Sequence, residues 1–232
     1  MSAQVFSRSA NTLTKLVIFV GLPIVLAILG GVWWYFGWSP QHRDVGVAIA
    51  QPGGGFNHQL HAGGLKMDCR YCHTSVEISS SANIPPTETC MGCHSQILTK
   101  SAKLAFVRDS YANNTPIQWN KVHDLPKFVY FNHGIHVTNG VGCSTCHGNI
   151  RKAAVVAKSQ PLFMSWCLDC HRNPAPNLRP QSEIYNTEWV APADQATKGP
   201  ELLKQYGIQL YEMSEKDGQS INRLTNCAIC HH

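Results

Sequence analysis

The chain has 232 residues, of which 44% are hydrophobic and 14% are charged, and its formal net charge is +5. This small positive charge is not gathered into a run of Lys or Arg, which argues against nucleic-acid binding. Ten cysteines are present, and each belongs to a C-x-x-C pair followed at once by histidine. Because no cysteine is left over, a disulfide framework, a zinc site or a thioredoxin-like pair explains the pattern poorly.

The first predicted element is an apolar helix over Leu16–Trp38, a stretch without charged residues. It is long enough to cross a bilayer core of about 30 Å and too long for the apolar region of a signal peptide. We therefore expect an uncleaved single-pass anchor in the cytoplasmic membrane, with 1–15 as a cytoplasmic N-terminus. Arg8 and Lys15 precede the helix, and the charges just beyond it balance, so the rest of the chain is expected on the periplasmic side.

A linker is predicted over 39–55, where Pro52 and three glycines break regular structure. The remaining residues, 56–232, form one predicted domain that contains a repeat. Each copy reads F-N-H-x-x-H, then C-x-x-C-H, then a second C-x-x-C-H. The first copy covers Phe56–His94 and the second covers Phe131–His171. A fifth C-x-x-C-H ends the chain.

Two longer segments carry no such motif. We expect a short helix within 95–110 and another around 199–207, where apolar residues recur at helical spacing. The segment 172–226 has little regular pattern. We expect it either to meet a partner protein or to wrap the cofactors.

Five copies of C-x-x-C-H indicate covalent attachment of c-type haem through two thioether bonds, with the adjacent histidine on the iron. We therefore expect five covalently bound haem c groups and a core made largely of porphyrin, enclosed by short helices and irregular loops. The attachment cysteines are Cys69, Cys72, Cys90, Cys93, Cys143, Cys146, Cys167, Cys170, Cys227 and Cys230. The proximal histidines are His73, His94, His147, His171 and His231.

Two H-x-x-H pairs, His58/His61 and His133/His136, precede the attachment motifs. A spacing of three places both imidazoles on one side of a helical turn, so each pair can serve two irons. We interpret them as distal ligands, which would close the second axial position and leave the haems to carry electrons. The expected pairs are His58 with His73, His61 with His94, His133 with His147 and His136 with His171, and exchange between the two copies stays open.

The distal ligand of the fifth haem is less defined. His123 is the leading candidate and Met164 is the alternative, with Met213, His42 and His232 behind them. A methionine ligand would raise the reduction potential of that haem relative to its bis-histidine neighbours.

F-x-H-x-x-H ahead of C-x-x-C-H resembles the multihaem cytochromes of the c3/c7 type. Longer strings are similar to a narrower family, the membrane-anchored pentahaem cytochrome c subunit of alternative complex III. These strings are GGLKMDCRYCHTSVE, IPPTETCMGCHSQI, VHDLPKFVYFNHGIHVTNGVGCSTCHG and MSWCLDCHRNP. The resemblance covers essentially the whole chain and is weakest over 172–226.

The resemblance implies a respiratory electron-transfer subunit that is not itself an enzyme. In such complexes a polytopic membrane subunit oxidises quinol, and an iron–sulfur subunit of the molybdopterin-oxidoreductase type receives the electrons. The pentahaem subunit then relays them to a monohaem cytochrome c, a soluble carrier or a terminal oxidase.

Three alternatives remain open from the sequence. One is a single-anchor multihaem quinol dehydrogenase, or tethered donor, that feeds a periplasmic reductase; the fifth motif and the absence of C-x-x-C-H-x-M argue against the tetrahaem form. Another is a catalytic multihaem reductase with one five-coordinate haem. The last is a membrane-tethered shuttle without a fixed complex.

Overall fold

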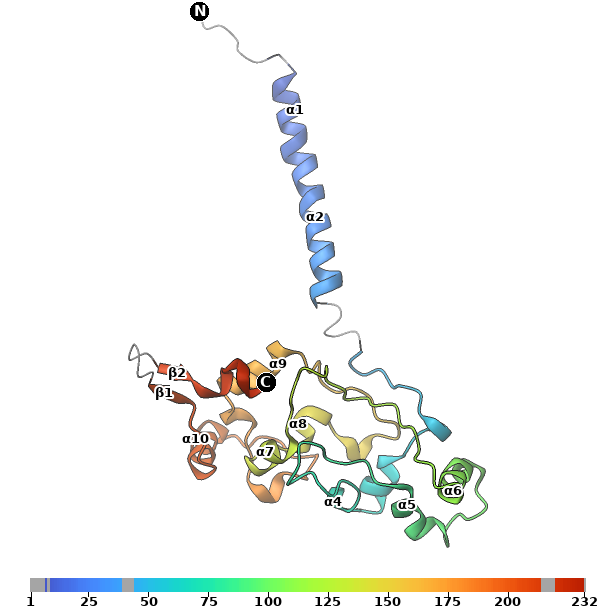
Figure 1. Ribbon diagram of the computed structural model, residues 1–232. Helices are drawn as coiled ribbons and strands as arrows, with labels where there is room; N and C mark the ends of the chain where they lie inside the picture. Colours follow the sequence, from blue (N-terminus) through green and yellow to red (C-terminus); the bar gives the residue numbers. More distant parts are fainter. Residues whose placement is uncertain (1–6, 8, 39–43, 214–219, 232) are drawn as a thin grey trace, which may run out of the picture. The chain divides into compact units, whose positions relative to one another are not determined.

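The structure is a computed structural model that describes residues 7, 9–38, 44–213 and 220–231. The chain divides into two compact units, Met1–Asp44 and Val45–His232, and each is considered by itself (Figure 1). The predicted membrane anchor belongs to the first unit, and all five C-x-x-C-H motifs belong to the second.

The first unit is a single continuous helix over Ala10–Trp38 (Figure 1), 29 residues with a mean hydropathy of 2.6. Its parts are α1 (Ala10–Leu16), a π-helical turn η1 (Val17–Gly21), α2 (Leu22–Trp33) and a second π turn η2 (Trp34–Trp38). The helix begins six residues before the predicted span. The turn η1 ends two residues before Pro23, which has no N–H to donate and whose ring crowds the preceding turn. Its length and composition fit a membrane crossing, as predicted.

The second unit consists of short helices joined by irregular segments, as predicted for the secondary structure of this domain. Its α-helices are α4 (Cys69–Cys72), α5 (Thr87–His94), α6 (Ala105–Ala112), α7 (His133–Thr138), α8 (Cys143–His147), α9 (Met164–Arg172) and α10 (Gln195–Gln205). A π turn, η4, covers Gln59–Gly64. The 3-10 turns are η3 (Pro52–Gly54), η5 (Ala102–Leu104), η6 (Ile150–Lys152), η7 (Ala175–Asn177), η8 (Gln181–Glu183), η9 (Arg223–Thr225) and η10 (Cys227–Ile229).

The described strands are short. β1 (Tyr211–Met213) and β2 (Ser220–Asn222) pair antiparallel, with Tyr211 opposite Asn222. Both predicted helices outside the motifs are present, as α6 and α10, although α6 starts only at Ala105.

The predicted linker from Val45 onward belongs to the second unit. Val45 forms a parallel bridge with Lys158, and Ala48 forms an antiparallel bridge with Ala157. The Gln51 amide donates to the Asn120 carbonyl at 2.7 Å and accepts from the Asn120 amide at 3.1 Å. These contacts explain why the second unit begins at Val45, and residues 39–43 lie outside the described part.

Side chains alone form a small core. Among the described residues, the buried hydrophobic side chains are Val76, Val107, Val137, Leu178, Ile184 and Leu202. The best buried of them, Ile184 at 0% exposure and Leu178 at 1%, come from the motif-free segment 172–226. This segment packs against the third motif, since the amide of Cys143 donates to the Ile184 carbonyl at 3.2 Å and Leu178 bridges Val141.

Candidate haem-attachment and iron-ligand sites

Every C-x-x-C-H motif begins on a helical turn. The turns are α4, α5, α8 and α9 for the first four motifs and η10 for the fifth. Residues three and four apart share one face of a helix, so both sulfurs and the histidine are directed to the same side. This is the arrangement that two thioether bonds and an iron ligand on one macrocycle require.

The ten thiols are not engaged with one another. All ten cysteines are free, and no group of three or more His, Cys, Asp or Glu in the described residues could hold a metal ion. Burial raises the pKa of Cys143 to about 11 and that of Cys146 to about 12, so both thiols stay protonated at neutral pH. A reactive redox pair needs the opposite shift.

The two F-N-H-x-x-H elements adopt the same ring geometry. In the first, the Phe56 ring lies edge-on to His58 at 4.7 Å and stacks on His61 at 4.4 Å between centroids. In the second, Phe131 meets the rings of the matching histidines, His133 and His136, at the same 4.7 Å and 4.4 Å. The phenylalanine therefore orients both imidazoles of each pair.

The asparagine of each element caps the following turn and orients the second histidine. Asn57 Oδ1 accepts from the Leu60 amide at 2.9 Å, and Asn132 Oδ1 accepts from the Ile135 amide at 3.2 Å. The backbone carbonyl of the same asparagine accepts from Nδ1 of His61 (2.9 Å) or His136 (2.7 Å).

Seven histidine rings are fixed in this way by backbone carbonyls. The Nδ1 atoms of His73, His94, His133, His171 and His231 reach the carbonyls of Asn83, Ile97, Ser80, Leu224 and Phe128, at 2.7–3.1 Å, in addition to His61 and His136. A carbonyl only accepts, so Nδ1 carries a proton, and in the neutral form of each ring Nε2 is the nitrogen with the lone pair. A hydrogen bond from the ring nitrogen that does not face the metal is the usual support of a metal-bound histidine.

Three pairs of imidazoles have matching separations. Ring centroids are 6.2 Å apart for His61 and His94, 6.3 Å for His133 and His147, and 6.1 Å for His136 and His171. A metal–imidazole bond of about 2.0 Å plus about 1.1 Å from nitrogen to ring centre, counted twice, gives about 6.2 Å. The donor set therefore fits iron held between two neutral imidazoles.

The fourth expected pair, His58 and His73, consists of neighbouring residues. Their rings are not among the described ring contacts at 6.1–6.3 Å. Burial, followed by the neighbouring His73 and His61, lowers the pKa of His58 to about 4. His58 is thus neutral at pH 7, and its Nδ1 is buried without a hydrogen-bond partner.

His123 lies beside the third motif. Its ring is 4.2 Å from that of His147, and its buried Nε2 has no partner. This contact is too short for an iron between the two rings. The other candidate, Met164, is 65% exposed at the first position of α9, one turn before Cys167. His42, His232 and the Met213 side chain lie outside the described residues.

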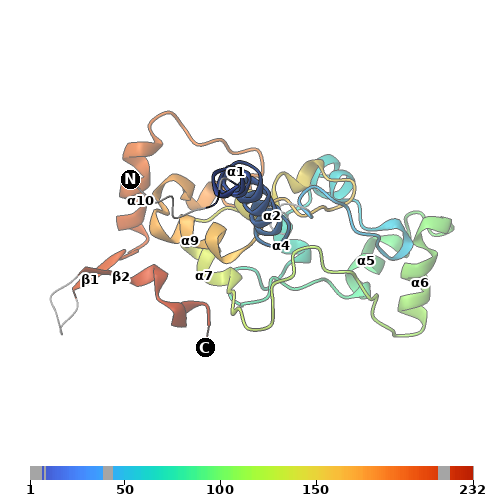
Figure 2. The same cartoon turned by 90° about the horizontal axis from the view of Figure 1, so that it is seen from above.

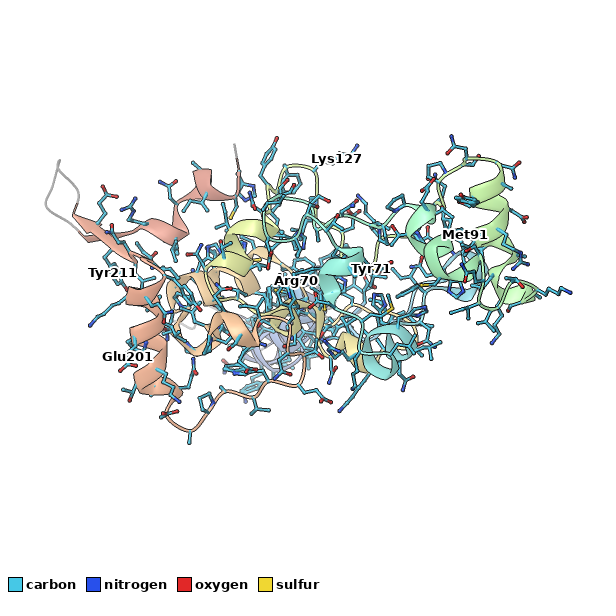
Figure 3. All side chains as sticks on the ribbon, turned by 90° about the horizontal axis from the view of Figure 1, so that it is seen from below. Arg70, Tyr71, Met91, Lys127, Glu201 and Tyr211 are labelled. Carbon is cyan, nitrogen blue, oxygen red and sulfur yellow. The ribbon has the colours of Figure 1, made fainter. Side chains whose placement is uncertain are left out.

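The motifs follow a spatial order that differs from their order in sequence. From α5 of the second motif, the domain passes through α4, then α8, then α9 to the C-terminal turns (Figures 1 and 2). In Figure 3, Arg70 and Tyr71 of the first motif lie between Met91 of the second motif and Tyr211.

Hydrogen bonds support the same order. The Gly134 amide donates to the Ser79 carbonyl at 3.0 Å, which joins the loop after the first motif to the turn before the third. Arg151, just after the third motif, donates to the Ala62 carbonyl at 2.5 Å. His171 of the fourth motif reaches Leu224, three residues before the fifth.

One buried charged residue was not predicted from the sequence. Arg179 is 3% exposed and contacts the third motif, although it lies in the motif-free segment. In sequence it is one arginine among prolines in RNPAPNLRP, and nothing local distinguishes it from a surface residue.

Comparison with known proteins supports a relationship to multihaem cytochromes c. Over 133 residues the chain is 31% identical to the multihaem cytochrome c subunit of menaquinone reductase from Nitratidesulfovibrio vulgaris strain Hildenborough. The match covers 56% of this chain and about 57% of the length of that curated relative. No family model matches the chain. The prediction of homology to a multihaem cytochrome c subunit is thereby confirmed.

Proposed function

We propose that this chain is an electron-transfer subunit of a quinone-linked membrane complex, with five covalently bound haem c groups. The observation that carries this proposal is the set of three imidazole pairs at 6.1–6.3 Å, each combining one histidine of an H-x-x-H pair with one of a C-x-x-C-H motif. Bound haem supplies one-electron chemistry. Two imidazoles per iron close both axial positions, so these sites move electrons and are not catalytic.

The proposed ligand pairs are His61 with His94, His133 with His147, His136 with His171, and His58 with His73. The first three are supported by ring separation. The last is supported by the proximity of His73, which after burial is the next cause of the lowered pKa of His58. The attachment residues remain the ten cysteines of the motifs.

For the fifth haem, held by His231, we favour Met164 over His123. Burial raises the pKa of Cys167 in α9, and the neighbouring Cys230 of the fifth motif raises it further. Helix α9 therefore lies beside the fifth motif. Met164 lies one helical turn before Cys167 and shares its face. The His123 ring is instead packed against His147.

The spatial order of the motifs gives the route. We propose that electrons pass along second, first, third, fourth and fifth haem, or in reverse. The second and fifth haems are then the ends where partners exchange electrons. The helix Ala10–Trp38 would anchor the chain in the cytoplasmic membrane, with the haem domain on the periplasmic side.

The sequence resemblance and the matched relative suggest two directions of electron flow. In an alternative complex III, electrons from quinol would arrive from an iron–sulfur subunit and leave to a cytochrome c or oxidase. The relative belongs to a menaquinone reductase, which favours the opposite direction, toward quinone.

The test is to isolate the haem c complex from native membranes and to follow haem reduction. If quinol reduces the haems and an added oxidised cytochrome c accepts the electrons, the first direction holds. If a reduced cytochrome donor loads the haems and quinone reoxidises them, the second holds. A protein that purifies alone and exchanges electrons with neither would contradict the proposal and favour a tethered donor to a reductase.

A further inference from the structure

A groove lies between helix α10 and the loop that follows η8, within the motif-free segment 172–226. Its volume is about 590 Å³, which is in the range of pockets that enclose a ligand. None of the described residues that line it is a cysteine or a histidine, so no C-x-x-C-H motif reaches it. The groove is therefore separate from the proposed haem sites.

The apolar lining of the groove is held in place by contacts within the chain. Trp189 and Leu202 line it, and Leu202 is buried. The Trp189 ring is fixed by Arg179, whose Cζ lies 4.3 Å from the ring centroid. On the α10 side, Gln195 Nε2 donates to two carbonyls of the preceding segment, each at 2.9 Å. A groove shaped in advance binds without the entropy cost of ordering its own side chains.

Further apolar side chains extend this lining toward solvent. Val190 is 81% exposed although it follows the half-buried Trp189, and Pro180 and Pro192 also line the groove. Apolar surface that is gathered in a concave site is typical of a binding surface. The groove therefore offers an apolar contact to another molecule.

The groove is acidic, although the formal net charge of the whole chain is +5. Its charged lining residues are one lysine, Lys198, and three glutamates, Glu183, Glu188 and Glu201. The ammonium of Lys198 is already paired with Asp194 at 3.1 Å. The only lining cation therefore does not neutralise the glutamates.

Two of the three glutamates have no ion pair. Glu188 pairs with Lys152 at 2.9 Å. Among the described residues, Glu183 and Glu201 are within ion-pair distance of no cation, and Glu183 accepts only from the Asn186 side-chain amide at 2.7 Å. In Figure 3, Glu201 lies at the opposite end of the domain from the second motif. The groove therefore complements a molecule that is both cationic and apolar.

We propose that this groove binds a basic segment of a partner protein. A Lys or Arg side chain of the segment meets Glu201 and Glu183, and a neighbouring apolar side chain packs on Trp189 and Val190. This inference rests on the proposed membership of a membrane complex and names one of its contact surfaces. Because no motif residue lines the groove, the contact holds the partner in place and leaves electron exchange to the haems.

The experiment places the photo-crosslinking residue p-benzoylphenylalanine at Val190 of the full chain and irradiates native membranes. The adduct is purified through this chain and its cross-linked peptide is mapped by mass spectrometry. We expect an adduct with one other polypeptide, at a segment that contains Lys or Arg. The same residue in place of Ala196, an exposed residue of α10 outside the groove, should not form this adduct.

Charge variants test whether the carboxylate selects the partner. Glu201→Lys should lower the yield of the adduct at least tenfold, and Glu201→Gln should lower it at least threefold. Asp109→Lys makes the same change of charge at an exposed carboxylate of α6 and should leave the yield unchanged. Replacing the cross-linked basic residue of the partner by Glu should restore the adduct in Glu201→Lys.

Haem content and haem spectra of the purified Glu201 variants should equal those of the parent, because the Glu201 side chain is exposed. If Glu201→Lys loses haem, Glu201→Gln decides alone. The inference is overturned by an adduct with lipid only, with a second copy of this chain, or with a segment that lacks basic residues. An adduct whose yield is the same in the Glu201 variants overturns it too.

The outcome is separable from that of the proposed function. If the complex purifies and exchanges electrons with quinone, but position 190 forms no adduct with another subunit, the docking inference alone is overturned. If the chain purifies alone, the proposed function already fails at that step, before irradiation, and the docking inference falls with it.

Discussion

The two copies of the repeat share their local geometry and differ in what surrounds them. Phe56 and Phe131 hold their histidines at identical ring distances, and Asn57 and Asn132 provide the same cap and the same carbonyl. Residues within six positions of one another therefore set ligand orientation without help from the rest of the fold.

The environment of the second copy comes from distant sequence. Ile184, Leu178 and Arg179 pack behind α8, where burial raises the thiol pKa values of the third motif to about 11 and 12. In the first copy, burial also raises the pKa of Cys69, Cys72 and Cys90. The comparison teaches that a duplicated motif can keep the same local ring geometry in surroundings that bury it to a different extent.

The largest expected difference between the copies concerns loss of a haem. Replacing both Cys143 and Cys146 by Ala should lose more than one haem and most of the folded protein, because α8 joins the first motif, the fourth motif and segment 172–226. Replacing Cys90 and Cys93 should lose one haem only, since α5 packs mainly on α6 at one end. Haem-to-protein ratio and soluble yield measure this, and equal losses would contradict the difference.

Replacing the second histidine of each H-x-x-H pair should have the same effect in both copies of the repeat. His61→Ala and His136→Ala should each convert one low-spin haem to high-spin, since each deletes a ligand at the iron-sharing distance. Electron paramagnetic resonance and optical spectra measure it. Gln59→Ala, an exposed position on the turn that carries His61, is the control. A spectrum unchanged in either histidine variant rules out that pair.

The fifth haem tests a ligand outside the repeat. Met164→Ala should make one haem high-spin and abolish a sulfur-to-iron charge-transfer band, whereas His123→Ala should leave all haems low-spin. Optical spectra of both variants decide between them. The reverse pattern would return His123 to the fifth haem, and no change in either would exclude both residues.

The smallest expected effect is on the caps. Asn57→Ala and Asn132→Ala should each lower the free energy of unfolding by about 1 kcal/mol, because each removes one side-chain acceptor from the start of a turn. Urea unfolding of the haem-loaded protein measures this, with Asn→Ser at the same positions as the control that keeps an acceptor. Clearly unequal losses would mean that the first copy, a π turn, depends on its cap differently from the second.

Local patterns were sufficient to predict the local structures. The apolar run predicted the N-terminal helix, and the helical spacing of apolar residues within 95–110 and around 199–207 predicted the helices found as α6 and α10. The spacing of His58 and His61 predicted one shared turn, as found in η4. The ligand pairs and the number of haems stay predictions, because iron bonds are what would define them.

The features that could not be predicted depend on contacts between residues far apart in sequence. Nothing in RNPAPNLRP indicates that Arg179 is buried behind α8, since its partners Ser144 and Thr145 are about 35 residues away. The contacts of Val45 with Lys158 and of Gln51 with Asn120 could not be predicted from the sequence either. The order of motifs in space follows from the same long-range packing.

The Ser80 carbonyl, in the loop after the first motif, links the two copies of the repeat by hydrogen bonds. It accepts from both the amide (3.2 Å) and Nδ1 (2.8 Å) of His133, so the first histidine of the second copy is oriented by the loop of the first. The first copy has no reciprocal support at this position, because His58 Nδ1 has no partner. The dependence runs in the direction of synthesis, because Ser80, which supplies the acceptor, precedes His133 in the chain.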